Sequence, residues 1–298
     1  MSTNLIKIAM VGLDTSHSVA FPQRMQAEEC PAEEKVSGMY VTACMRFETP
    51  FQNKDGLDVR QKMLEGWGVK VTESFEETVA DCDAVMISIN DPSCHLEYFR
   101  KCVTLGKPIF LDKPLADTIA HGREIAALVK SKGLKVMSCS SLRYVTALLD
   151  ACATVPAPTQ TSTFGPLGRA PAGSSIVWYG VHAFEMLERA MGRGAARMTV
   201  VNAGTGVVCV VEYADGRRGV VELSEGNYSY GGTLRGDGKA AAFIVDMDRA
   251  YTLQLIEIGK FFRTGKAFLT FDDTMEVMAL LDAAQQSFQT GKTVPVLI

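Results

Sequence analysis

The chain has 298 residues, 47% of them hydrophobic, so it can bury a sizeable core and two ordinary domains are expected. Lys and Arg number 30 against 34 Asp and Glu, giving a net charge of -4. With no basic block to neutralise a row of phosphates, nucleic acid is excluded as an expected partner. No segment suits a membrane span or a secretory signal, and the 8 cysteines form no C-x-x-C pair, which favours a cytoplasmic protein with reduced thiols.

The first half of the chain alternates short apolar runs with longer amphipathic ones, which is typical of a parallel α/β sheet. The expected strands are 5–11, 39–45, 69–74, 84–90, 108–113 and 134–139. Expected helices at 97–106 and 120–133 each end at a glycine that suits a helix C-cap. We therefore predict a doubly wound, Rossmann-type dinucleotide-binding domain over residues 1–140.

The second half has a different composition, because residues 156–175 are rich in Pro, Gly, Ser and Thr and predict loops with at most one strand. The elements expected after them are a helix at 181–192, a hairpin turning at Asp215-Gly216, a strand around 241–247 and two long helices at 251–265 and 274–291. This order predicts an α+β substrate and oligomerisation domain over residues 141–298, with an open, mostly antiparallel sheet and helices on one face.

The turn after the first expected strand reads "GLDTSH", where a dinucleotide-binding turn normally reads Gly-x-Gly-x-x-Gly. Only Gly12 is retained, and Asp14 and His17 stand at the second and third glycine positions. A diphosphate needs close approach to this backbone and to a helix N-terminus. A phosphate about 4 Å from the Asp14 carboxylate is repelled by roughly 4 kcal/mol at an effective dielectric of about 20, unless Asp14 turns away.

The helix after this turn is expected to start near Ser16 or Ser18, because Pro22 is tolerated only in a first turn. Either serine suits an N-cap. Alternatively, Thr15, Ser16 and His17 replace glycine amides by side-chain donors to a phosphate. Both interpretations can hold, because one serine can cap the helix while its neighbour binds.

A family resemblance emerges from three segments. The run "CDAVMISINDPSCHLEYFRKCVTLGKPIFLDKPLA" resembles the stretch with the Glu-Lys-Pro signature of the glucose–fructose oxidoreductase and inositol dehydrogenase family (Gfo/Idh/MocA), with Asp112-Lys113-Pro114 in its place. "WYGVHAFEMLERAMG" and "DAAQQSFQTGKTVPV" resemble that family's substrate-domain helix and C-terminus. The resemblance implies NAD or NADP as cofactor, a sugar, cyclitol or other polyol as substrate, and a homodimer or homotetramer.

The resemblance also implies that Lys113 and His182 face the substrate. His182 would take the proton of the substrate hydroxyl, and Lys113 would stabilise the developing oxyanion. The acid that normally stands four residues before this histidine falls on Trp178. Glu185 shares a helix face with His182 and is the expected replacement that orients its ring, unless a substrate carboxylate does so.

Further positions follow from the same family pattern. Asn90 belongs to the loop that lines the nicotinamide pocket and His95 to the helix that follows this loop, beside Asp112 of the signature. Arg143 and Tyr144 would reach a sugar from a hinge strand, although packing or capping accounts equally well for His95 and Tyr144. We assign no metal, because the spacing of the histidines matches no compact ligand motif.

The cofactor type depends on Arg46, which stands where a ribose-binding acid normally follows the second strand. An arginine there can receive the 2′-phosphate of NADP, or it can simply be solvated.

Three functions remain open. The first is an NAD(P)-dependent oxidoreductase that acts on a sugar, cyclitol or related polyol. The second is a cofactor-free homologue that binds a small ligand or a protein partner, which the altered turn and the missing acid both favour. The third is a lyase or hydrolase that keeps its nicotinamide bound.

Overall fold

The computed structural model describes residues 5–298, which form two compact units, each considered by itself. The first unit comprises the chain up to Ala116 together with Glu124–Ser138 and Tyr251–Thr270. The second comprises Asp117–Arg123, Cys139–Ala250 and Phe271–Ile298. None of the helices in residues 5–298 combines the length and the apolar surface that a bilayer crossing requires.

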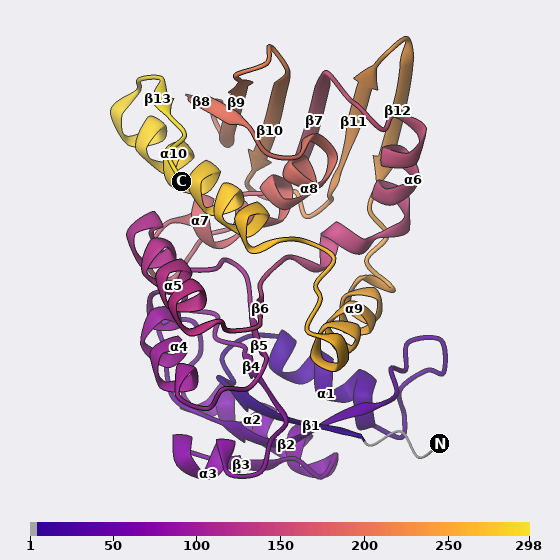
Figure 1. The fold of residues 1–298 in the computed structure, drawn as a ribbon, viewed down its shortest axis with the longest axis vertical. Coiled ribbons are helices and arrows are strands. Elements are labelled where there is room, and N and C mark those ends of the chain that lie inside the picture. Colours follow the sequence, from indigo (N-terminus) through magenta and orange to yellow (C-terminus); the bar gives the residue numbers. More distant parts are fainter. Residues whose placement is uncertain (1–4) are drawn as a thin grey trace. The chain divides into compact units, whose positions relative to one another are not determined.

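The first unit is built on a six-stranded parallel sheet, in the order β3-β2-β1-β4-β5-β6 (Figure 1). Its strands are β1 (Ile6–Val11), β2 (Met39–Met45), β3 (Lys70–Thr72), β4 (Ala84–Ile87), β5 (Ile109–Leu111) and β6 (Val136–Met137). The four strand residues 84–87 and the three residues 109–111 are all buried, as in a sheet covered on both faces. All six expected strands are present, and the predicted doubly wound sheet is confirmed.

Helices cover both faces of this sheet. They are α1 (His17–Gln26), α2 (Lys54–Gly66), α3 (Phe75–Val79), α4 (His95–Val103), most of α5 (Ile119–Lys132) and nearly all of α9 (Ala250–Thr264). Right-handed crossovers place α1 and α2 on one face and α3 to α5 on the other. The helix α9 is distant in sequence from the rest of the first unit. Its Thr252 hydroxyl donates to the Glu34 carbonyl at 2.9 Å. This contact helps to place residues 251–270 in the first unit.

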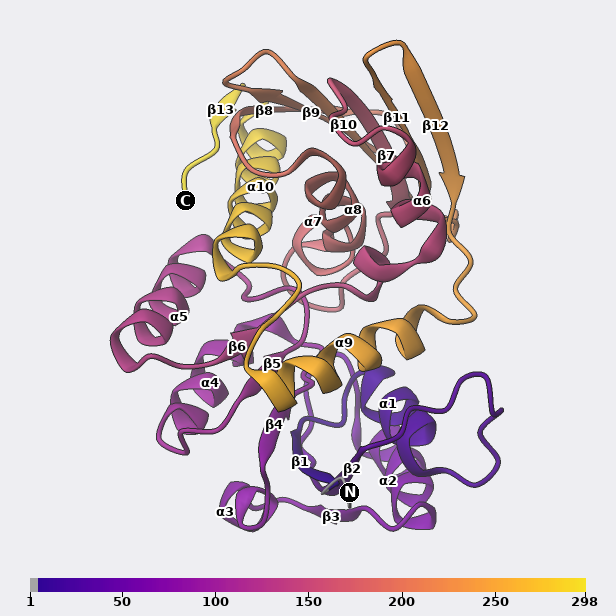
Figure 2. The ribbon, with the colours of Figure 1, turned by 45° about the vertical axis from the view of Figure 1, so that its right-hand side comes forward.

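The second unit contains a seven-stranded sheet in the order β12-β11-β7-β10-β9-β8-β13 (Figure 2). Its strands are β7 (Gln160–Pro166), β8 (Ala195–Asn202), β9 (Gly206–Tyr213), β10 (Arg218–Ser224), β11 (Gly231–Gly236), β12 (Lys239–Ile244) and β13 (Val294–Pro295). Neighbouring strands are antiparallel except for the parallel pair β7 and β10. The predicted, mostly antiparallel sheet is confirmed, and so is the hairpin, whose Gly216 has a φ of +89°.

One face of this sheet is covered by helices, as Figure 2 shows. They are α6 (Thr146–Thr154), the single turn α7 (Ser175–Trp178), α8 (Val181–Met191) and α10 (Phe271–Thr290). Residues along β9 alternate between buried and half-buried, so the opposite face of the sheet is the more open one.

Residues 141–144, which the sequence suggested as part of a hinge strand, form the 3-10 helix η2 (Ser141–Tyr144) instead. The Ser140 hydroxyl caps it by accepting the Leu142 N–H at 3.1 Å. A serine that can satisfy an orphan amide favours such a turn over an extended strand.

Candidate functional site

The turn after β1 lies where the strand order of the first sheet reverses, because β1 pairs in parallel with both β2 and β4. Open α/β sheets bind ligands outside the carboxyl ends of their strands at this point. Gly12 has a φ of +104°, and a Cβ on it would lie 2.5 Å from the Ser88 carbonyl oxygen. Glycine is therefore required at position 12 both for its backbone conformation and for the close approach to the end of β4.

Asp14, at the second glycine position, turns its carboxylate into the protein and is 1% exposed. It accepts the N–H groups of Asn90 at 2.7 Å and Asp91 at 3.3 Å, and the Thr49 hydroxyl at 2.8 Å. Burial raises its pKa, and these hydrogen bonds act in the opposite direction. The carboxylate thus joins the turn to the loops that follow β2 and β4, and its charge is compensated by protein donors.

We expect Asp14→Ala to destabilise the first unit by about 1–3 kcal/mol, because two backbone N–H groups and one hydroxyl lose a charged acceptor. The measurement is urea unfolding followed by the fluorescence of Trp67, in a Trp178→Phe background. Asp14→Asn, which keeps one acceptor oxygen, is the matched variant and should lose less. Equal stability of all three proteins would contradict this assignment.

His17, at the third glycine position, is also held inside the first unit. Its Nδ1 lies 2.6 Å from Asp112 Oδ2, and its ring stacks on Phe21 with a centroid separation of 5.0 Å. Burial opposes the ionisation of Asp112, yet its pKa lies below the usual range because His17, Lys113 and the Lys113 N–H favour the carboxylate. The His17 imidazole is therefore a hydrogen-bond partner of Asp112, whereas the sequence suggested it as a donor to a phosphate.

The helix α1 begins at His17 with Ser16 at the N-cap position, as expected, although no side-chain hydrogen bond caps it. Pro22 lies inside this helix, beyond its first turn, so the expectation that it falls in the first turn is wrong. Thr15 Oγ1 accepts the His17 N–H at 3.3 Å, and the Ser18 hydroxyl donates to the Gly12 carbonyl at 3.0 Å. Of the three suggested donors, only Ser16 is exposed. Within residues 5–298, the backbone N–H groups of Thr15, Ser16 and Ser18 have no hydrogen-bond partner, so the helix start offers amides to an anion.

Arg46, the residue considered for a 2′-phosphate, interacts with two side chains of α2. Its Nη2 lies 2.7 Å from Asp58 Oδ1, and its Nη1 donates to Gln61. A hollow of about 500 Å³ opens here, lined by Arg46, Phe47, Glu48, Lys54, Leu57 and Glu73. The two carboxylates of this lining are unfavourable to an added phosphate, and its two cations, Arg46 and Lys54, are both already paired with Asp58.

The loop after β4 carries the other two expected nicotinamide-pocket residues. Asn90 gives its backbone N–H to Asp14. His95 is fully buried, with Nε2 2.8 Å from the Ile89 carbonyl oxygen and Nδ1 3.3 Å from that of Leu115. These contacts connect His95 to Ile89 and to Leu115, which follows the Asp112-Lys113-Pro114 signature. Packing therefore accounts for the presence of a buried histidine at this position.

Lys113 follows β5 and is only 8% exposed. Within the described residues, its ammonium group has neither a hydrogen-bond acceptor nor an ion-pair partner in the same chain. A buried lysine is normally paired, because leaving its charge unsatisfied is costly. An unpaired ammonium at the carboxyl end of a sheet strand is therefore suited to meet a ligand oxygen.

In the second unit, His182 is the second residue of α8, whose N-cap is Gly180. Its Nδ1 lies 2.7 Å from Ser140 Oγ. Glu185, which we expected to orient the ring, instead accepts the Ser140 N–H at 3.1 Å and pairs with Arg143 at 2.7 Å. Ser140 is therefore a direct partner of the His182 ring, and Glu185 contacts the backbone N–H of Ser140.

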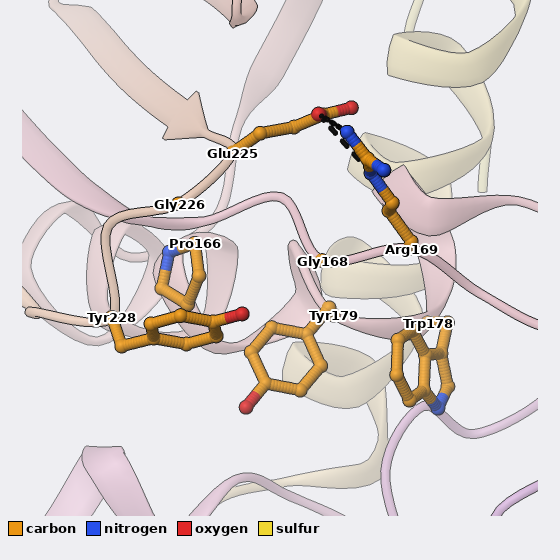
Figure 3. A pocket seen from close by; sticks show the side chains of 8 residues that line it. All are labelled: Pro166, Gly168, Arg169, Trp178, Tyr179, Glu225, Gly226 and Tyr228. Carbon is orange, nitrogen blue, oxygen red and sulfur yellow. Dashed lines mark hydrogen bonds and ion pairs between the residues drawn. The ribbon is translucent and has the colours of Figure 1, made fainter.

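The other expected substrate residues of this unit are engaged in its interior. Arg143, 3% exposed, forks between Glu185 and Glu188, with a contact of 2.5 Å to the latter. The Tyr144 hydroxyl lies 3.3 Å from Cys139 Sγ, and Tyr144 is buried as well. Trp178 of the expected set lines a pocket, together with Tyr179 and Tyr228 (Figure 3).

The triad of Arg143, Glu185 and Glu188 predicts a pH dependence. Burial raises the pKa of Glu185 from its ordinary value of 4.5 to about 7, although the Arg143 charge opposes the shift. The folded chain then binds more protons than the unfolded chain between these values, so this group's contribution to stability falls as the pH rises from 4.5 to about 7. Urea midpoints measured across that range should fall less steeply with pH in Glu185→Gln, and an unchanged slope would contradict the assignment.

Comparison with known proteins supports the resemblance. A profile of an oxidoreductase family with an NAD-binding Rossmann fold, GFO_IDH_MocA, matches residues 54–139. The Uncharacterized oxidoreductase YhhX of Escherichia coli is 30% identical over 84 residues, which span 28% of this chain and only 24% of that relative. These matches confirm the resemblance to the Gfo/Idh/MocA family.

Solved structures share the fold over nearly the whole chain. A myo-inositol dehydrogenase from Lactobacillus casei, in complex with NAD(H) and myo-inositol, has a TM-score of 0.81 at 14% identity, covering 99% of this chain and 97% of its own. A myo-inositol dehydrogenase from Corynebacterium glutamicum has a TM-score of 0.78 at 17% identity, with 99% of each chain covered. At these identities the likeness establishes the architecture alone.

Proposed function

We propose that this chain, whose residues 54–139 match the NAD-binding Rossmann-fold oxidoreductases, transfers hydride between NAD and a hydroxyl-bearing carbon of a polyol, sugar or cyclitol. The observation that carries the proposal is Lys113, a residue only 8% exposed at the carboxyl end of β5, whose ammonium has no hydrogen-bond or ion-pair partner within the described residues. Both structurally similar proteins described above are myo-inositol dehydrogenases, which supports a polyol as the substrate class. Assembly into a homo-oligomer through the open face of the second sheet belongs to the same proposal.

The residues of the first unit fit a dinucleotide in spite of the altered turn. The N–H groups of Thr15, Ser16 and Ser18 would hold its diphosphate at the start of α1, beside the close backbone approach at Gly12. The carboxylate of Asp14 is compensated by three donors, so its repulsion of a phosphate is reduced.

We further propose NAD in preference to NADP. Glu48 and Glu73 line the hollow after β2, and Arg46 is already paired with Asp58. A 2′-phosphate would have to displace Asp58 from Arg46 while lying near two carboxylates. A ribose hydroxyl can instead donate to either carboxylate.

In the proposed reaction, a nicotinamide held by the first unit would supply the hydride acceptor, and the residues of this chain would handle the proton and the charge. His182 takes the hydroxyl proton on Nε2, which requires the tautomer whose Nδ1–H donates to Ser140 Oγ. Ser140 itself is fixed by Glu185, which accepts its backbone N–H. The family resemblance implies that Lys113 of the first unit faces the same substrate, and its positive charge would stabilise the alkoxide that forms as the proton departs.

Ser140→Ala tests the orienting role of Ser140. We expect kcat to fall by about 10-fold to 100-fold, because His182 loses the acceptor that fixes its tautomer. The pH profile of kcat should shift as well, which a purely structural role would not cause. Ser141→Ala, a neighbouring buried serine, is the matched variant, and an equal loss in both would contradict the assignment.

The function itself is tested by following NADH formation from NAD⁺ with myo-inositol, scyllo-inositol and common aldoses. We expect at least one substrate to give saturable turnover that Lys113→Ala strongly reduces. Absence of turnover across this panel, together with absence of NADH binding, would favour the cofactor-free homologue.

One observation favours the second function, the cofactor-free homologue. Asp14 takes the backbone N–H groups of Asn90 and Asp91, which are therefore unavailable to a nucleotide. In a cofactor-free protein the carboxylate would occupy the place of a phosphate permanently. Nucleotide titration distinguishes the two functions.

A further inference from the structure

The second unit contains an aromatic pocket of about 490 Å³ (Figure 3). Its lining consists of Pro166, Gly168, Arg169, Trp178, Tyr179, Glu225, Gly226 and Tyr228. Three of these eight side chains are large aromatic rings, and Tyr228 is 74% exposed. Large aromatic rings left open to solvent beside polar groups are characteristic of ligand sites.

The pocket is held in shape by its surroundings. Gly168 has a φ of +68°, and a Cβ on it would approach both Trp178 and Tyr179 to 3.1 Å. The loop after β7 therefore packs closely against these two rings. They contact each other as well, with a centroid separation of 4.9 Å.

The polar end of the pocket is an ion pair without net charge. Arg169 Nη2 lies 2.6 Å from Glu225 Oε2, and Figure 3 shows the pair at the rim opposite the tyrosines. The guanidinium can donate and the carboxylate can accept, so together they match hydroxyl groups, which do both. An anionic ligand would meet the Glu225 charge, so a neutral ligand is favoured.

The pocket adjoins the proposed base. The Tyr179 ring lies 5.6 Å from the His182 ring, edge to face. Trp178 occupies the position at which the family resemblance expects the acid that orients the histidine, and its indole adds an apolar wall to the pocket. A ring seated between Tyr179 and Tyr228 would therefore lie beside the reacting group of the substrate.

We infer that this pocket binds a second, non-reacting pyranose ring, so that the substrate is a glycoside larger than a free monosaccharide or cyclitol. A pyranose ring offers an apolar C–H face to Trp178, Tyr179 and Tyr228, and a rim of hydroxyls to Arg169 and Glu225. The inference rests on the proposed function for the identity of the reacting ring, whereas binding of the second ring requires no cofactor and no turnover.

The test uses the full chain with Trp67→Phe, which leaves Trp178 as the only tryptophan, since the chain has 2. Maltose, cellobiose, lactose, sucrose and trehalose are titrated without nucleotide, each beside its own monosaccharides, and Trp178 emission is followed. We expect at least one disaccharide to bind about tenfold more tightly than its monosaccharides.

Variants in the same background localise the binding. Tyr228→Ala should weaken disaccharide binding by about tenfold, since it removes one aromatic wall. Tyr228→Phe keeps the ring and should bind within about twofold of the parent. Phe288→Ala removes an exposed aromatic ring of the same unit outside the pocket and should have no effect.

Three results would overturn the inference: equal binding of disaccharides and monosaccharides, an unchanged affinity in Tyr228→Ala, or no saturable signal with any sugar of the panel. Calorimetric titration with NADH, run separately, reports on the proposed function. Sugar binding without NADH binding would count against the oxidoreductase alone, and NADH binding without preference for disaccharides would count against the second ring alone.

Discussion

Lys113→Ala is expected to lower kcat/KM for the polyol substrate by about 10²-fold to 10³-fold, the loss that follows removal of one preorganised group facing a developing oxyanion. The reason is that no other cation pairs with this alkoxide in the proposed reaction. The loss of stability should be smaller than the loss of activity, because the ammonium makes no direct ion pair within the described residues and acts on the Asp112 carboxylate only through its charge. Steady-state kinetics and urea unfolding of the same preparation provide the two readouts.

Two further variants separate charge from geometry at this position. Lys113→Arg keeps the charge but moves it, and should recover only part of the activity. Lys132→Ala removes an exposed lysine near the end of α5 and should leave kcat/KM unchanged. Undiminished turnover in Lys113→Ala would exclude this residue from the mechanism.

Arg143→Met is expected to destabilise the second unit by about 3–5 kcal/mol, the cost of removing one partner from a buried ion pair. Glu185 and Glu188 would remain buried, at 2% and 3% exposure, without their shared counter-charge. Urea unfolding followed by Trp178 fluorescence in a Trp67→Phe background measures the loss in the second unit.

The matched control is Arg218→Met, which removes an exposed arginine of β10 and should change stability by less than about 0.5 kcal/mol. Adding Glu185→Gln and Glu188→Gln to Arg143→Met should recover part of the lost stability, because the unpaired charges are then gone. A loss below about 1 kcal/mol in Arg143→Met would show that the triad does not hold this part of the unit together.

Much of the fold could be predicted because its signals are local. Continuous apolar runs such as Ile6–Val11 and Ala84–Ile87 are short and bounded by turns, which distinguishes buried parallel strands from helices. Asp215-Gly216 marked a hairpin because Gly216 adopts a positive φ. Gly12 could be recognised for the same kind of reason, since the turn requires a residue without a Cβ.

The partners of the site residues could not be predicted, because they are distant in the sequence. Asp112 meets His17 across 95 positions, and Ser140 meets His182 across 42. Such pairs depend on strand register and helix packing, which no local pattern specifies. Glu185 was expected to act on His182 because the two residues share a helix face, but the buried Arg143 attracts its carboxylate more strongly.

The substitutions in the glycine turn likewise have partners that the sequence could not predict. The sequence shows that Asp14 replaces a glycine, but not that Asn90 and Asp91 present N–H groups to receive its carboxylate. Residues 251–270 likewise carry an ordinary amphipathic pattern, which identifies a helix but not the unit on which it packs.

The central claim is that a turn with Asp14 and His17 in place of two glycines still binds a dinucleotide. Calorimetric titration of the purified chain with NADH and NADPH tests it most directly. We predict saturable, one-to-one binding of NADH with a dissociation constant below about 1 mM, and weaker binding of NADPH. Heat signals that never saturate with either nucleotide at millimolar concentration would contradict the claim and leave the cofactor-free homologue as the better account.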